Sequence, residues 1–171
     1  MGVATRAGRR VSEAAGSIER LTSESDLLHC AQLMATSEPW VTLGRTIESS
    51  RRTLQDPGKE VYVLKERDAV QGFVVIDLRG PFTGYLQSVW VRPELRGKGY
   101  GARLIAHAET RIFLDSPNVF ICVSTFNTGA RRLYERLGYV VVGELNDFLV
   151  RGHGEILMRK TRGPWSELAH T

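Results

Sequence analysis

Cysteine is scarce in this chain of 171 residues, and the two that are present, Cys30 and Cys122, lie far apart in apolar surroundings. Neither belongs to a Cys-x-x-Cys pair or to a Cys/His cluster with the spacing of metal ligands. Free cysteine is among the most frequently buried residue types. We therefore expect two reduced core thiols and no bound metal.

Long apolar runs are also missing, since no segment approaches the roughly 20 apolar residues that a membrane-spanning helix needs. Arg9 and Arg10 precede Val-Ser-Glu-Ala-Ala-Gly rather than the apolar core of a secretion signal. Arg6 stands where a myristoylation signal has Ser or Thr. The sequence therefore predicts a soluble, cytoplasmic protein with no membrane partner.

A strong excess of one charge sign is absent from most of the chain. The formal net charge is +4, and residues 1–16 supply about half of it. The remainder favours an anionic ligand such as a phosphorylated cofactor but does not demand a nucleic-acid partner. We expect residues 1–16 to be a flexible tail, residues 17–160 to be one globular domain and residues 161–171 to be a weakly patterned C-terminal tail.

What the sequence does contain is a series of helix and strand patterns. The spacing of apolar residues predicts helices over 23–34, 46–54, 99–114 and 127–137, and strands over 17–21, 61–64, 72–78, 85–91, 119–123, 139–148 and 155–158. Short turns between consecutive strands indicate an antiparallel meander. The predicted fold class is α/β of the α+β type, with a mixed, largely antiparallel sheet of six or seven strands flanked by helices.

The strongest local signal lies between a predicted strand and a predicted helix. There Gly97, Gly99 and Gly101 alternate, while Arg96 and Lys98 supply positive charge. Glycine lets backbone N–H groups converge, and a helix N-terminus adds unpaired N–H donors and a favourable dipole. The segment therefore predicts a loop that binds a pyrophosphate.

The same glycines allow a second interpretation, because Gly97-x-Gly99-x-x-Ala102 also satisfies the dinucleotide-binding pattern of nicotinamide-dependent oxidoreductases. That interpretation fits less well, since residues 92–96 separate the strand from the first glycine and the preceding strands are antiparallel. The strand over 119–123 also lacks the acidic residue that would hold a ribose. The lack of Gly-Lys-Ser/Thr excludes a Walker P-loop.

Two motifs follow one another along the chain: Arg96-x-x-Gly99-x-Gly101, and then Asn127-x-x-Ala130-x-x-Leu133-Tyr134-Glu135-x-Leu137-Gly138-Tyr139. They resemble the motifs of the GNAT family of N-acetyltransferases, and the resemblance extends from about Ser17 to Lys160. It implies a GNAT-like acyl-CoA acyltransferase fold. It also implies transfer of an acetyl group from acetyl-CoA to a primary amine, of a protein, a peptide or a small molecule, by direct attack in a ternary complex.

The resemblance further implies roles for individual residues. Acetyl-CoA would be bound by Val89, Val91, Arg96, Gly97, Lys98, Gly99, Tyr100, Gly101, Ala102, Asn127, Ala130 and Tyr134. A bulge would splay the strand of Val89 and Val91 from the next parallel strand, and a backbone donor there would stabilise the oxyanion. Tyr134 would be the general acid that protonates the leaving thiolate. A non-catalytic CoA-binding regulatory module is the alternative, and it would tolerate loss of Tyr134.

The general base is harder to identify from the sequence. Many relatives carry a glutamate where this chain has Gln87, and some carry one where it has Cys122. A direct carboxylate base at these positions is therefore excluded. Glu38, His153 and Glu155 remain as groups that could feed a chain of water molecules.

The acceptor side carries the weakest signal. Glu38, Trp40 and Phe148 are the residues that could line an acceptor pocket, although an aromatic side chain at such positions is as often part of the core. The sequence leaves open which amine is acetylated, and whether the chain is a monomer or a homodimer.

Overall fold

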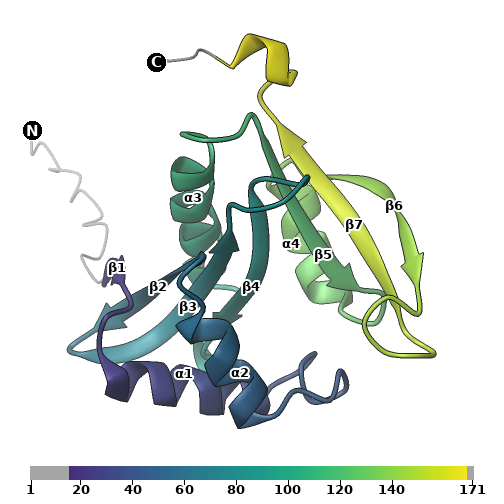
Figure 1. Ribbon diagram of the computed structural model, residues 1–171. Coiled ribbons are helices and arrows are strands. Elements are labelled where there is room, and N and C mark those ends of the chain that lie inside the picture. The colour runs from purple at the N-terminus through teal and green to yellow at the C-terminus, as the bar shows by residue number, and fades with distance from the viewer. Residues whose placement is uncertain (1–15, 169–171) are drawn as a thin grey trace, which may run out of the picture.

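A seven-stranded mixed sheet forms the centre of residues 16–168, the part of the chain that the computed structural model describes (Figure 1). In chain order its elements are β1 (Ser17–Arg20), α1 (Glu24–Ala35), α2 (Ile47–Gln55), β2 (Lys59–Glu66), β3 (Ala69–Asp77), β4 (Tyr85–Val91), η1 (Pro93–Leu95), α3 (Tyr100–Ile112), β5 (Asn118–Ser124), α4 (Thr128–Arg136), β6 (Val140–Asn146), β7 (Gly154–Thr161) and η2 (Trp165–Glu167). Each predicted helix and strand is found, with ends shifted by a few residues.

The sheet order is β1-β2-β3-β4-β5-β7-β6, and β4–β5 is its parallel pair, the other neighbours being antiparallel. This arrangement confirms the predicted largely antiparallel sheet. It differs from the parallel, doubly wound sheet of a dinucleotide-binding fold. The strand β7 reaches Thr161, the first residue of the predicted C-terminal tail, and the predicted tail over 1–16 lies outside the described residues except for Gly16.

Helix ends follow local capping signals. The Ser23 hydroxyl accepts a hydrogen bond from the Asp26 amide (3.3 Å) at the start of α1. Thr46 and Ser49 form a reciprocal capping box at the start of α2. Such caps satisfy N–H groups that have no partner within the helix. The predicted helix starts at Ser23 and Thr46 are therefore confirmed to within one residue.

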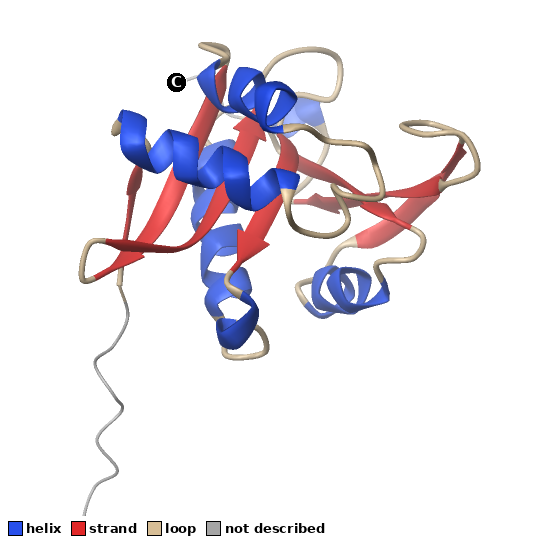
Figure 2. Ribbon diagram, turned by 90° about the horizontal axis from the view of Figure 1, so that it is seen from below, coloured by secondary structure: helices blue, strands red, loops and turns tan. Residues whose placement is uncertain are grey.

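Two hydrophobic cores lie on opposite faces of the sheet, and two helices cover each face (Figures 1 and 2). On one face α1 and α2 pack on β2, β3 and β4, with Met34, Phe73 and Trp90 at the centre. On the other face α3 packs through Leu104 and Ile105, and α4 adds mainly Tyr134. Both helix pairs are thereby fixed relative to the middle of the sheet.

Strands β4 and β5 diverge in the middle of the sheet. They pair only at Tyr85 with Phe120 and at Leu86 with Ile121. On the other side of β4, the register with β3 slips so that Gln87 has no partner residue. An extra residue of this kind bends its strand. The predicted bulge is therefore present, and the second half of β4 leaves its parallel neighbour.

Candidate active site

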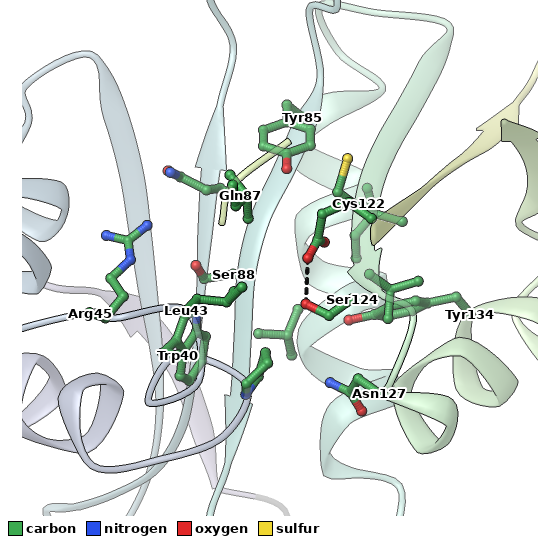
Figure 3. Close-up of a pocket in the computed structure, with 16 residues that line it drawn as sticks. Trp40, Leu43, Arg45, Tyr85, Gln87, Ser88, Cys122, Ser124, Asn127 and Tyr134 are labelled. Carbon is green, nitrogen blue, oxygen red and sulfur yellow. Dashed lines mark hydrogen bonds between the residues drawn. The ribbon is translucent and has the colours of Figure 1, made fainter. Parts of the chain in front are cut away.

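Two cavities open where β4 and β5 diverge. The large cavity, of about 930 Å³, lies over the end of β4, the glycine-rich loop and α4. The small cavity, of about 240 Å³, lies between the α1–α2 loop, β4, β5 and β7 (Figure 3). Pro39, Val89, Asn127 and Tyr134 line both cavities. The two cavities therefore adjoin at these four residues.

The glycine-rich loop forms a cradle in the wall of the large cavity. Gly97 and Gly99 have φ angles of 73° and 89°, which disfavour other residues, and no atom lies within 4 Å of a Cβ added at either one. Gly99 also precedes the first turn of α3, whose first backbone bond runs from Arg103 to the Gly99 carbonyl (3.0 Å). The amides from Gly99 to Ala102 thus have no partner within the helix, an arrangement that suits a phosphate.

Three arginines line the same cavity. Arg96 follows the end of β4, where its Nε donates to the Val91 carbonyl (3.2 Å). Arg132 and Arg136 come from α4, one helical turn apart. Both α4 arginines lie outside the set of residues predicted from the sequence, although their i, i+4 spacing after the Asn127 cap indicates a shared helix face. Together the three side chains provide countercharge for a phosphorylated ligand.

Most of the residues predicted to bind acetyl-CoA line the large cavity, but Lys98 and Tyr100 do not. The Lys98 side chain is exposed to solvent. The Tyr100 hydroxyl donates to the Glu66 carboxylate (2.5 Å), and its ring packs on the core. Tyr100 therefore offers this site only its backbone amide.

Tyr134 lies at the junction of the two cavities. Its side chain is 7% exposed, and among the described residues none hydrogen-bonds to its hydroxyl. Burial raises the pKa of the Tyr134 phenol, so it remains protonated at neutral pH. Asn127 lies beside it and caps α4 by accepting from the Ala130 amide (3.3 Å). The junction thus holds a buried proton donor at a fixed position.

The small cavity contains one buried carboxylate. Glu155 on β7 is 3% exposed, and Ser124, its partner on β5, donates a hydrogen bond to it (2.5 Å; dashed line in Figure 3). Burial raises the pKa of Glu155, and the Ser124 hydrogen bond and the charge of His153 oppose this shift. Of the three groups named from the sequence as possible proton acceptors, Glu155 is the one that lines this cavity.

Other polar groups complete the wall of the small cavity. Arg45, from the α1–α2 loop, donates from Nη1 to the Thr53 hydroxyl (2.7 Å). The Gln87 Oε1 and Ser88 Oγ atoms are buried and have no hydrogen-bond partner among the described residues. Buried polar atoms without partners cost free energy, so they favour a polar ligand at this position.

Of the three residues predicted to line an acceptor pocket, one lines the small cavity, one lines the large cavity and one lines neither. Trp40 is 7% exposed and both lines the small cavity and stacks on Phe73 in the core (6.3 Å between ring centroids). Glu38 lines the large cavity, where its carboxylate accepts from the amide and hydroxyl of Thr42. Phe148 is 56% exposed and lines neither cavity, whereas its neighbour Leu149 lines the small one.

Among residues 16–168, no group of three or more His, Cys, Asp or Glu side chains is placed to hold a metal ion. Cys30 and Cys122 are both free thiols, the first buried and the second in the wall of the small cavity. No helix within this described range has both the length and the apolar character required to cross a bilayer.

Comparison with known proteins identifies the class. The model of the acetyltransferase (GNAT) family matches residues 26–139, and the chain therefore belongs to this family. Blasticidin-S acetyltransferase from Streptomyces morookaense is 32% identical over 42% of this chain, and the chain spans only 58% of the length of that relative.

Solved structures agree with the fold. An aminoglycoside 6'-N-acetyltransferase in complex with coenzyme A matches 86% of this chain and 98% of its own, with a TM-score of 0.71 and 19% identity. A spermidine N-acetyltransferase variant from Vibrio cholerae matches 85% of this chain and 92% of its own, with a TM-score of 0.65 and 21% identity. These similarities establish a GNAT fold, whose mixed sheet differs from the parallel, doubly wound sheet of a dinucleotide-binding fold.

Proposed function

We propose that the chain transfers an acetyl group from acetyl-CoA to a primary amine that binds in the small cavity. The observation that carries this proposal is the junction of the two cavities beside Tyr134. One cavity offers unpaired amides and arginines to a phosphorylated ligand, and the other offers a buried carboxylate and unpartnered polar atoms to an acceptor. Because the cavities adjoin, both reactants would be bound at once in a ternary complex. Aligning them at one point removes much of the entropic barrier to transfer.

The residues present fit the donor. The amides from Gly99 to Ala102, with Arg96, Arg132 and Arg136, would hold the pyrophosphate, and the open space at Gly97 and Gly99 leaves room for it. Val89 and Val91 would lie beside the pantetheine at the unpaired end of β4. Acetyl-CoA supplies the activated thioester when bound, and the coenzyme A in the similar aminoglycoside acetyltransferase supports this choice.

Two side chains would handle protons. Tyr134 holds a proton on its hydroxyl at the junction, where the leaving thiolate needs one. Glu155, in the same small cavity, would accept a proton from the acceptor ammonium, directly or through water. A protonated amine cannot attack, and a raised carboxyl pKa brings the base closer to the working pH.

The acceptor is proposed to be a small molecule. A cavity of about 240 Å³ suits a small amine better than a protein segment. The name of the blasticidin-S acetyltransferase relative supports the same class. A cytoplasmic location, a metal-free reaction, the lack of a nucleic-acid or membrane partner, and the choice between monomer and homodimer remain predictions from the sequence.

The test combines binding and turnover. The full chain is titrated calorimetrically with acetyl-CoA, CoA and NAD, and thiol release is then followed with a panel of small amines. We expect acetyl-CoA to bind and thiol release to fall about 100-fold or more in Tyr134→Phe, with acetyl-CoA affinity retained. Binding without turnover in the wild type would instead support the non-catalytic module. Absence of binding to any CoA species would overturn the proposal.

A further inference from the structure

We propose that the acceptor carries an anionic group of the carboxylate type in addition to its amine, and that Arg45 is the residue that binds this group. The inference rests on the proposed function, because it concerns the acceptor of that same reaction. It would make Arg45 the specificity residue of the small cavity.

Arg45 has a fixed position in the cavity wall. Its loop is closed by backbone hydrogen bonds from Arg45 to Trp40 (2.9 Å) and from Leu43 to Pro39 (3.0 Å). The Thr53 hydroxyl donates to the Ser49 carbonyl (3.2 Å), which leaves its lone pairs free to accept from the guanidinium. Arg45 is therefore held in the cavity wall by its own loop and by α2.

Arg45 has no counter-ion among the described residues. No described Asp or Glu lies within ion-pair distance of Arg45, and Thr53 is the one described residue to which its side chain donates a hydrogen bond. A guanidinium has five N–H donors, so most of its donor capacity is unused. Burial lowers the pKa of Arg45, which is the sign of a cation removed from water without full compensation. An anion in the cavity would supply that compensation.

Charged groups are distributed unevenly around the small cavity. Arg45 lies with Trp40 and Leu43 on one side, and the Ser124–Glu155 pair and Tyr134 lie on the other (Figure 3). Burial raises the pKa of Tyr85, which lines the cavity as well, and so keeps this phenol neutral. The cavity thus offers one cation and one carboxylate on opposite walls. This polarity matches a molecule with an anionic group at one end and an amine at the other.

The same distribution disfavours a polycationic acceptor. A polyamine would bring several positive charges into a cavity whose wall contains one carboxylate, Glu155, and the cation of Arg45. Like charges at short range are unfavourable where water is largely excluded. Between the two charged walls, the unpartnered Gln87 Oε1 and Ser88 Oγ would bind polar groups in the middle of the acceptor.

The experiment uses sets of three amines of equal chain length: an ω-amino acid, its primary amide and the corresponding diamine. The far end of the molecule is then negative, neutral or positive, while the reacting amine is nearly unchanged. Thiol release at saturating acetyl-CoA gives kcat/KM for each, over a range of chain lengths. We expect the amino acid to exceed the amide by about 10- to 100-fold, the range for a hydrogen-bonded charge pair, and the diamine to be poorest.

Variants separate recognition from folding. Arg45→Met should abolish the preference, so that the ratio of kcat/KM for the amino acid to kcat/KM for the neutral amide falls from about 10- to 100-fold to about 1. Arg45→Lys should restore part of the preference, because it keeps the charge and loses the planar fork. The control is Arg52→Met on α2, an exposed arginine outside both cavities. A purely structural role for Arg45 would instead lower all three rates equally.

The inference would be overturned if the wild type acetylated the amide or the diamine as fast as the amino acid. It would also be overturned if Arg45→Met lowered kcat/KM equally for all three amines, or if no anionic member showed turnover or saturable binding. The proposed function fails in a different way, through absence of acetyl-CoA binding or of thiol release with every amine. Turnover of neutral amines without the charge preference would keep the function and remove the inference.

Discussion

The large and the small cavity are built by different means, although they share Tyr134 and three other lining residues. The large cavity depends mainly on backbone, namely a glycine loop in left-handed conformation and the first amides of α3, to which Arg96 and the α4 arginines add charge. The small cavity depends on single side chains from the α1–α2 loop, β4, β5 and β7. Backbone amides recognise the phosphates of any acyl-CoA. Side chains scattered over four segments can change one at a time, and they can therefore adapt the acceptor site.

The largest effect in the small cavity should come from Glu155→Gln, which keeps an acceptor for the Ser124 hydroxyl but removes the proton acceptor. We expect the rate of thiol release to fall about 100-fold, since a positioned acid–base group typically contributes 10²- to 10⁴-fold. Because burial raises the pKa of Glu155, the pH–rate profile of the wild type should have an ascending limb, and its midpoint should lie above the ordinary pKa of a carboxyl group. A variant that retains this limb would contradict the assignment.

Stability measurements on Glu155→Gln test whether unfolding causes the lower rate of thiol release. A raised pKa means that the folded protein binds this proton more tightly than the unfolded chain does. The stabilisation from the carboxyl is then present at acid pH and is lost as the pH rises through the raised pKa. Glu155→Gln should therefore be more stable than wild type at neutral pH, and this difference should close below the ordinary glutamate pKa.

The contrast between the cavities also explains what the sequence could predict. The glycine loop, the Asn127 cap and Tyr134 belong to contiguous motifs, so local spacing was sufficient to find them. Arg45 and Glu155 are separated by most of the chain, and they line one cavity only because the sheet order places β7 beside β5. No local pattern marks Arg45 as part of a site, and Glu155 could be named from the sequence only as one of three groups able to feed a chain of water molecules.

Side-chain direction was the second limit of the sequence analysis. Lys98 and Tyr100 alternate with the glycines of the loop, and they were predicted to bind acetyl-CoA from this position alone. The turn into α3 directs Tyr100 to Glu66 and leaves Lys98 in solvent. The bulge itself was expected from the family resemblance, but its position at Gln87 depends on the register of β3 against β4, which pairing across the sheet determines.

An intermediate effect is expected in the large cavity from Gly99→Ala. A Cβ there meets no protein atom within 4 Å, so the cost to folding comes from the φ angle of 89°, about 1–2 kcal/mol. The methyl group would occupy space that the phosphates need, and acetyl-CoA should bind about 10-fold more weakly. Calorimetry measures the loss of affinity, and thermal unfolding measures the loss of stability.

The control for this variant is Gly143→Ala, whose Cβ is also free of contacts, and it should change neither the affinity for acetyl-CoA nor the stability. Unchanged affinity in Gly99→Ala would show that the phosphates lie elsewhere.

The smallest effect tests the rim of the small cavity, where adjacent residues of the β6–β7 connection differ. Leu149 lines the cavity and Phe148 does not, although both side chains are about half exposed. Leu149→Ala should raise the KM for the acceptor about 3-fold, because a half-exposed leucine contributes only part of the roughly 1.5–3 kcal/mol of full burial. Phe148→Ala should leave this KM unchanged, and both variants should keep the wild-type affinity for acetyl-CoA. A larger effect of Phe148→Ala would mean that this connection turns inward when the acceptor binds, which would place the aromatic ring in the pocket as the sequence analysis expected.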